Sequence, residues 1–137
     1  MSDIQFFMPM IPPTITAQQH KVAFLNGKPV FYDPPELKAA KAKLEAHLAQ
    51  HRPKKPLEGP LTLSVIWIFP TGGKHKDGEP KITKPDTDNL QKALKDILQK
   101  LGFFKDDMQI YFENCMKLYG DTPGIDIAIL MDDSDGR

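Results

Sequence analysis

The sequence predicts a two-layer α+β domain, with two helices on one face of a mixed four-stranded sheet and the order βαβαββ. Four segments alternate apolar and polar residues with the period of two that strands show. Two others repeat apolar residues at the spacing of amphipathic helices. The chain has 137 residues, 40% hydrophobic and 26% charged, as one globular domain usually has. We expect a single domain over residues 1–131 and a frayed tail over 132–137.

The first strand is predicted at residues 4–10, where apolar side chains alternate until a Pro-Pro pair at 12–13 ends the run. A hairpin is predicted within residues 22–32. Its turn would be Asn26-Gly27, because this pair favours the positive φ angles of a two-residue hairpin turn.

The first helix is predicted to start at Asp33-Pro34-Pro35-Glu36. The acid suits the N-cap, proline suits the first helical position, and the glutamate falls three residues after the cap. About four turns follow, because apolar residues recur at helical spacing at Leu37, Ala40, Leu44 and Leu48.

The second strand is predicted at residues 61–69 and at the centre of the sheet, because it is apolar on both faces. Residues 71–85 hold three glycines, two prolines and four lysines, which predicts a long mobile loop. A second helix should then bury Leu90, Leu94, Ile97, Leu98 and Leu101.

Gly102 is expected to end this helix, because glycine readily adopts the left-handed conformation found there. Alternation predicts a third strand from Met108 through Phe112, whose course past Asn114 is ambiguous, and a fourth over residues 125–131. The turn between these strands is expected at residues 120–124.

The charges are balanced overall but segregated along the chain. Lysine and arginine total 18 against 18 acidic residues, so net charge gives no argument for nucleic acid. Residues 38–55, however, hold six basic residues and one acid, whereas residues 106–135 hold eight acids and one base. This suits a metal-dependent enzyme acting on a polyanion, although most surface charge runs are only solvated faces.

No apolar run approaches the ~20 residues that a membrane helix needs. The first ten residues lack the basic start and cleavage site of a signal peptide. We therefore expect a cytoplasmic protein with no membrane partner. Cys115 is the only cysteine, which excludes an internal disulfide and a cysteine zinc site.

The segment most informative about chemistry is residues 84–92, Lys-Pro-Asp-Thr-Asp-Asn-Leu-Gln-Lys. Pro85 favours an extended approach to the helix, and in an extended segment Asp86 and Asp88 point the same way. Two neighbouring carboxylates repel each other, so the pair suits a bound cation. Lys92 lies one helical turn after Asp88 and places an ammonium group beside them.

A second acidic pair, Asp106-Asp107, opens the strand that follows this helix. Packing of that strand on the helix could supply a third carboxylate. The sequence therefore predicts that Asp86, Asp88 and Asp107 converge within metal-sharing distance, with Asp106 as the substitute if Asp107 points away.

Each of these residues also has a simpler structural explanation. Asp88 could be the helix N-cap with Gln91 completing a capping box, and Lys92 could be a surface partner. Asp106-Asp107 could open a turn. Capping of the helix by Asp88 leaves Asp86 and the second acidic pair unexplained.

Residues 85–92 and 102–110 together resemble the RusA family of Holliday junction resolvases, often carried by prophages. The shared pattern is D-x-D-N-x-x-K followed downstream by D-D-x-Q-[IV]. The resemblance is sharp over residues 84–110 and looser over 61–131.

The resemblance implies a magnesium-dependent, structure-selective endodeoxyribonuclease, with Mn²⁺ as a possible substitute metal. Asp86, Asp88 and Asp107 would bind the metal and Lys92 would act near the scissile phosphate. The chain would form a homodimer and act on branched DNA, the four-way junction. Basic residues expected to contact DNA are Arg52, Lys54, Lys55, Lys74, Lys76, Lys81 and Lys84.

Two other functions remain open at this point. One is a phage DNA-binding module whose basic segment 38–55 binds DNA without cutting it. The other is a magnesium enzyme that hydrolyses free nucleotides and ignores branched DNA. Magnesium-dependent cleavage of a four-way junction distinguishes the nuclease from both.

Overall fold

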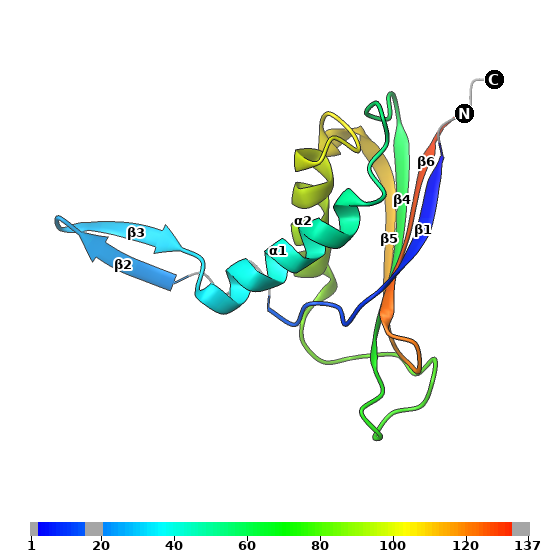
Figure 1. The fold of residues 1–137 in the computed structure, drawn as a ribbon, viewed down its shortest axis with the longest axis horizontal. Coiled ribbons are helices and arrows are strands. Elements are labelled where there is room, and N and C mark those ends of the chain that lie inside the picture. Colours follow the sequence, from blue (N-terminus) through cyan, green and yellow to red (C-terminus); the bar gives the residue numbers. More distant parts are fainter. Residues whose placement is uncertain (1–2, 16–20, 133–137) are drawn as a thin grey trace.

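The computed structural model describes residues 3–15 and 21–132. Two helices and four strands build the main layers, and a separate hairpin lies before the first helix (Figure 1). Beyond Asp132, the tail predicted to fray lies outside the described residues. The elements are β1 (Ile4–Pro9), β2 (Lys21–Leu25), β3 (Lys28–Tyr32), α1 (Pro35–Ala49), β4 (Leu61–Pro70), α2 (Thr87–Lys100), the 3-10 turn η2 (Asp107–Gln109), β5 (Ile110–Gly120) and β6 (Gly124–Met131).

The main sheet has the strand order β1-β6-β4-β5. β4 and β5 run parallel, whereas β6 pairs antiparallel with both β1 and β4. Both helices lie on the same face of this sheet (Figure 1). The predicted α+β class, the mixed four-stranded sheet and the one-sided helical layer are therefore confirmed.

The core lies between the sheet and the two helices. β4 is a central strand, as predicted, and buries every second residue against the helical layer. Each large apolar side chain buried there contributes about 1.5–3 kcal/mol relative to an exposed one. Prominent members of the core are Leu61, Leu63, Val65, Trp67 and Phe69 of β4, Leu90, Leu94 and Leu98 of α2, and Leu44 and Leu48 of α1.

Parallel strands need a crossover connection, and α2 supplies it between β4 and β5. β5 is one of the two edge strands of the sheet, with β1 at the other edge. One side of α2 therefore lies along the helix-facing residues of an edge strand, and polar side chains from both elements can line an open groove.

β2 and β3 form a two-stranded sheet that projects away from the main sheet at the start of α1 (Figure 1). Asn26 and Gly27 have φ angles of 53° and 77°, as the predicted hairpin turn requires. The hairpin leaves large apolar side chains exposed, with Phe24 at 74% of its full accessibility. Others of this kind are Val22, Leu25, Val30 and Tyr32.

Some element boundaries differ from those expected. Pro34, and not Asp33 as predicted, is the N-cap of α1, and it makes no side-chain capping hydrogen bond. The Asp33 carboxylate instead accepts a hydrogen bond of 2.8 Å from Lys41 Nζ. β5 starts at Ile110 because Met108 lies inside the η2 turn. Gly102 has a φ of 85° just past α2, as predicted.

Gly124 gives one test of the packing between β1 and β6. A Cβ there would clash with the ring of Phe7 and lie 2.6 Å from the Met8 carbonyl oxygen. The ring can move, but the carbonyl belongs to β1 itself. We expect Gly124→Ala to lower the free energy of unfolding by about 1–3 kcal/mol, measured by urea denaturation. If Phe7→Ala restored full stability to this variant, the backbone contact would not be the cause.

Candidate active site

Three of the predicted site residues, Asp88, Lys92 and Asp107, line one open cavity of about 580 Å³ between α2 and β5. Asp86 and Asp106 are not among the residues that line it. The other lining residues are Thr87, Gln91, Lys95, Asp96, Glu113 and Cys115.

Asp86 is the N-cap of α2. Its Oδ1 accepts a hydrogen bond of 2.8 Å from the Asn89 backbone N–H. The capping role considered for Asp88 therefore belongs to Asp86. Asp88 lies in the first turn of α2, where the positive end of the helix dipole stabilises a carboxylate.

The start of α2 is fixed by Lys117 of β5. Its ammonium group donates bonds of 2.7 Å to the backbone carbonyls of Thr83 and Pro85. Pro85 directly precedes Asp86, and Thr83 lies three residues before it. We call these two hydrogen bonds from Lys117 the Lys117 clamp. The clamp determines where the chain enters the helix and where Asp86 and Asp88 lie.

The segment before this clamp lies along β5, through backbone bonds from Gly78 N–H to the Tyr119 carbonyl (2.7 Å) and from Lys81 N–H to the Lys117 carbonyl (3.0 Å). His75 stacks on Tyr119 with ring centroids 3.7 Å apart. Lys81 lies over the same ring. The mobility expected for residues 71–85 stays a prediction.

Asp106 is the N-cap of the η2 turn. Its Oδ1 accepts a bond of 2.9 Å from Met108 N–H, and Gln109 Oε1 accepts from Asp106 N–H at 3.1 Å, which completes a capping box. Asp106, considered as the substitute ligand, is therefore occupied in closing the turn, and Asp107 is the member of the pair that lines the cavity.

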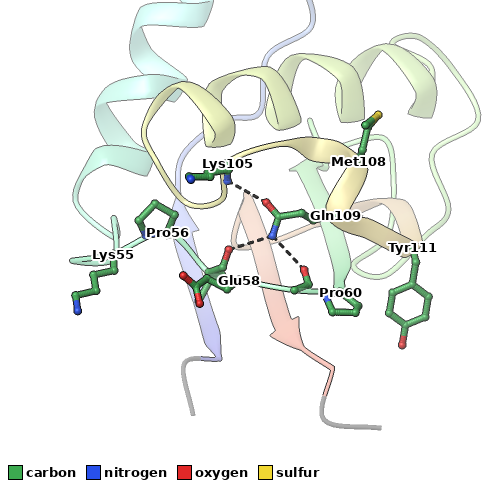
Figure 2. Close-up of a pocket in the computed structure, with 10 residues that line it drawn as sticks. Lys55, Pro56, Glu58, Pro60, Lys105, Met108, Gln109 and Tyr111 are labelled. Carbon is green, nitrogen blue, oxygen red and sulfur yellow. Dashed lines mark hydrogen bonds between the residues drawn. The ribbon is translucent and has the colours of Figure 1, made fainter. Parts of the chain in front are cut away.

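Gln109 also joins the turn to the linker that precedes β4. Figure 2 shows its side chain between Lys105 and the segment from Pro56 to Pro60. Its Nε2 donates to the carbonyls of Leu57 and Gly59, at 3.1 and 3.0 Å. The linker before β4 thus holds the turn in which Asp107 lies.

The predicted convergence of Asp86, Asp88 and Asp107 is not seen within the chain. Among the described residues, no three His, Cys, Asp or Glu side chains gather closely enough to hold a metal ion. Asp88 lies at the start of α2, whereas the Asp107 N–H bonds to Gln99 Oε1 near its end, at 3.0 Å. The eleven residues from Asp88 to Gln99 rise about 16 Å along the helix axis. The metal-binding role of each aspartate stays a prediction.

The donor types in the cavity nevertheless fit a hard divalent cation. Four carboxylates line it against two ammonium groups, an excess of two negative charges. Mg²⁺ is commonly held by only one or two carboxylates, with water and phosphate oxygens completing its coordination. The charged lining residues are Asp88, Asp96, Asp107, Glu113, Lys92 and Lys95.

The sequence did not predict a series of hydrogen-bonded polar side chains at the wall of the cavity. The Trp67 indole N–H donates to Gln91 Oε1 at 2.8 Å, and Gln91 Nε2 donates to Glu113 Oε2 at 2.7 Å. Lys95 Nζ donates to Glu113 Oε1 at 2.9 Å. Lys95 lies three residues after Lys92 and so on the same face of α2. This spacing is the sequence signal that could have identified Lys95 as a residue of the cavity.

Cys115 lies in the same cavity but is unsuited to metal binding or nucleophilic attack. Burial is the main cause that raises the pKa of its thiol to about 11, with smaller contributions in the same direction from the carboxylates of Glu113 and Asp88. A thiol with this pKa stays protonated near pH 7.

Most of the basic residues predicted to contact DNA are on the surface. Arg52, Lys54 and Lys55 are exposed in the linker after α1, and Lys74, Lys76 and Lys84 are exposed before α2. Lys81 is partly buried, with its ammonium group 5.0 Å from the centroid of the Phe69 ring. None of the helices in residues 3–15 and 21–132 is long and apolar enough to cross a membrane.

Comparisons with known proteins point to one family. The family model described as Endodeoxyribonuclease RusA matches residues 11–130. A protein of Lactococcus phage r1t named crossover junction endodeoxyribonuclease rusA is 32% identical over 129 residues, which cover 93% of this chain and 95% of the phage protein. The uncharacterized protein YqaN of Bacillus subtilis strain 168 is 32% identical over 115 residues, 76% of this chain and 80% of that protein.

Proposed function

Because the chain belongs to the RusA family of endodeoxyribonucleases, we propose that it is a magnesium-dependent nuclease that resolves four-way DNA junctions. The observation that carries the proposal is the cavity in which Asp88, Lys92 and Asp107 line one acidic groove along α2. All three belong to the motif shared with the family. We also propose that the protein acts in the cytoplasm, as expected for a phage-type enzyme that acts on DNA.

Asp86, Asp88 and Asp107 are the residues proposed to hold the metal. When bound, Mg²⁺ or Mn²⁺ would supply an activated water and neutralise charge on the leaving oxygen. Asp86 also fixes the first turn of α2 by capping it. Lys92 would place its ammonium group beside the phosphate and stabilise the charge of the pentacovalent state.

We propose a homodimer with two-fold symmetry, because resolving a junction needs two coordinated cuts on strands of like polarity. The exposed apolar side chains of the β2–β3 hairpin support a protein contact of this kind. Light scattering at micromolar concentration should give the mass of two chains. A monomeric mass would count against resolution of junctions.

The decisive experiment is a gel assay of a synthetic four-way junction with and without Mg²⁺, with linear duplex of the same sequence as the control. We expect cleavage of the junction only when the metal is present. Binding without cutting would favour the non-catalytic DNA-binding module. Hydrolysis of free nucleotides with no action on the junction would favour the nucleotide enzyme.

The basic linker is expected to contribute to affinity and not to the chemical step. Lys54→Ala combined with Lys55→Ala removes two proposed phosphate contacts, so the slope of log K against log salt should become shallower by about two. The cleavage rate at saturating DNA should stay near wild type. Lys100→Ala, which removes a lysine paired with Glu45, is the control. An unchanged salt slope in the double variant would contradict these contacts.

A further inference from the structure

The side chain of Gln91 has one possible orientation. It is the one buried polar or charged side chain among the described residues, with 5% of its surface exposed. The Trp67 indole can only donate a hydrogen bond, so the carbonyl oxygen of Gln91 must face it. The amide NH₂ of Gln91 must therefore point to Glu113, as it does at 2.7 Å.

Each carboxylate oxygen of Glu113 accepts a hydrogen bond from a different donor. Oε2 accepts from Gln91, and Oε1 accepts from Lys95 Nζ at 2.9 Å. The side chains of Lys95 and Glu113 are only 25% and 27% exposed, so this pair is less screened by water than most surface ion pairs. The buried side-chain amide of Gln91 therefore fixes Glu113, and Glu113 in turn fixes the position of the Lys95 ammonium group.

The position of Lys95 matters because of its neighbours. Lys95 lies one helical turn before Gln99, which accepts a bond from the Asp107 N–H. Lys95 and Asp88 also line the same cavity. An ammonium group released from Glu113 would thus remain among the carboxylates proposed to bind the metal and would neutralise part of their charge.

We propose that Glu113, fixed by Gln91, is a positioning residue that holds Lys95 against β5 and so preserves the negative charge with which Asp88 and Asp107 attract a divalent cation. This inference rests on the proposed metal-dependent function. It assigns Glu113 no contact with the metal itself.

The test is titration of the full-length protein with Mn²⁺ in the absence of DNA, followed by electron paramagnetic resonance of the free ion. Glu113→Gln keeps the shape of the side chain but removes the negative charge that holds Lys95, and we expect Mn²⁺ affinity to fall about tenfold. Glu113→Gln combined with Lys95→Met removes both charges, and affinity should return close to the wild-type value.

The matched control is the exposed Glu45–Lys100 pair, whose Lys100 also lies on α2 and whose N···O distance is likewise 2.9 Å. Glu45→Gln should leave Mn²⁺ affinity unchanged. Gln91→Leu, which keeps every charge but frees Glu113, should also weaken binding, with circular dichroism to confirm the fold.

Three results would overturn the inference. If the double variant bound Mn²⁺ as weakly as Glu113→Gln alone, Glu113 would be a ligand and not a positioning residue. If neither Glu113→Gln nor folded Gln91→Leu changed the affinity, the Lys95 contact would have no role in metal binding. If wild-type protein bound no Mn²⁺, the proposed metal site would fail as well, and the junction assay with Mg²⁺ would show this separately.

Discussion

Replacing Asp88 or Asp107 by asparagine is expected to lower cleavage of four-way junctions by about a thousandfold, which corresponds to roughly 4 kcal/mol in the activation free energy. Asparagine keeps the shape of the side chain but removes one negative charge from the proposed metal site. Binding of the junction should be unchanged or stronger, because an acid beside a polyanion has been removed. Single-turnover cleavage and a gel-shift titration measure the two effects separately.

Asp86 and Asp106 provide matched comparisons for these variants. Asparagine is about as good an N-cap as aspartate, so Asp86→Asn should leave stability unchanged while still impairing cleavage. Asp106→Asn should cut at nearly the wild-type rate, because Asp106 closes the η2 turn. If Asp88→Asn and Asp107→Asn cut at the wild-type rate, the non-catalytic DNA-binding function would replace the nuclease.

Lys92→Ala is expected to lower the cleavage rate at saturating DNA about a hundredfold, with little change in junction affinity. A positive group aimed at developing negative charge acts mainly in the transition state, and removal of one such group typically costs a factor of 10² to 10³. Kinetics at several DNA concentrations separate kcat from KM. Lys100→Ala, on the same helix but paired with Glu45, should behave as wild type.

A different pattern for Lys92→Ala would assign the residue another role. A raised KM with an unchanged kcat would mean that Lys92 contributes equally to binding the ground state and the transition state. Lys92 would then be one of the DNA-binding lysines, and stabilisation of the pentacovalent state would have to come from elsewhere.

The elements that were predicted correctly depend on local patterns. Alternation and helical spacing gave β4, α2 and β6, and Asn26-Gly27 gave the hairpin turn, because short-range backbone preferences decide these features. The strand order is a different kind of property. The insertion of β6 between β1 and β4 depends on pairings between residues far apart in the chain.

In the candidate site, too, some features follow from local sequence patterns and others depend on contacts between distant residues. The motif residues Asp88, Lys92 and Asp107, which line one cavity, could be identified from the sequence, since helical spacing places Lys92 one turn after Asp88 and the second acidic pair follows the end of the helix. Which aspartate caps α2 was decided by tertiary structure, because the Lys117 clamp fixes where the chain enters the helix. The polar chain through Gln91 and Glu113 likewise exists only in the folded chain, where α2 brings Gln91 against β4 and β5. Asp88 lies at the start of α2, whereas the Asp107 N–H bonds to Gln99 near the end of the helix, and spacing in the sequence alone cannot reveal this arrangement.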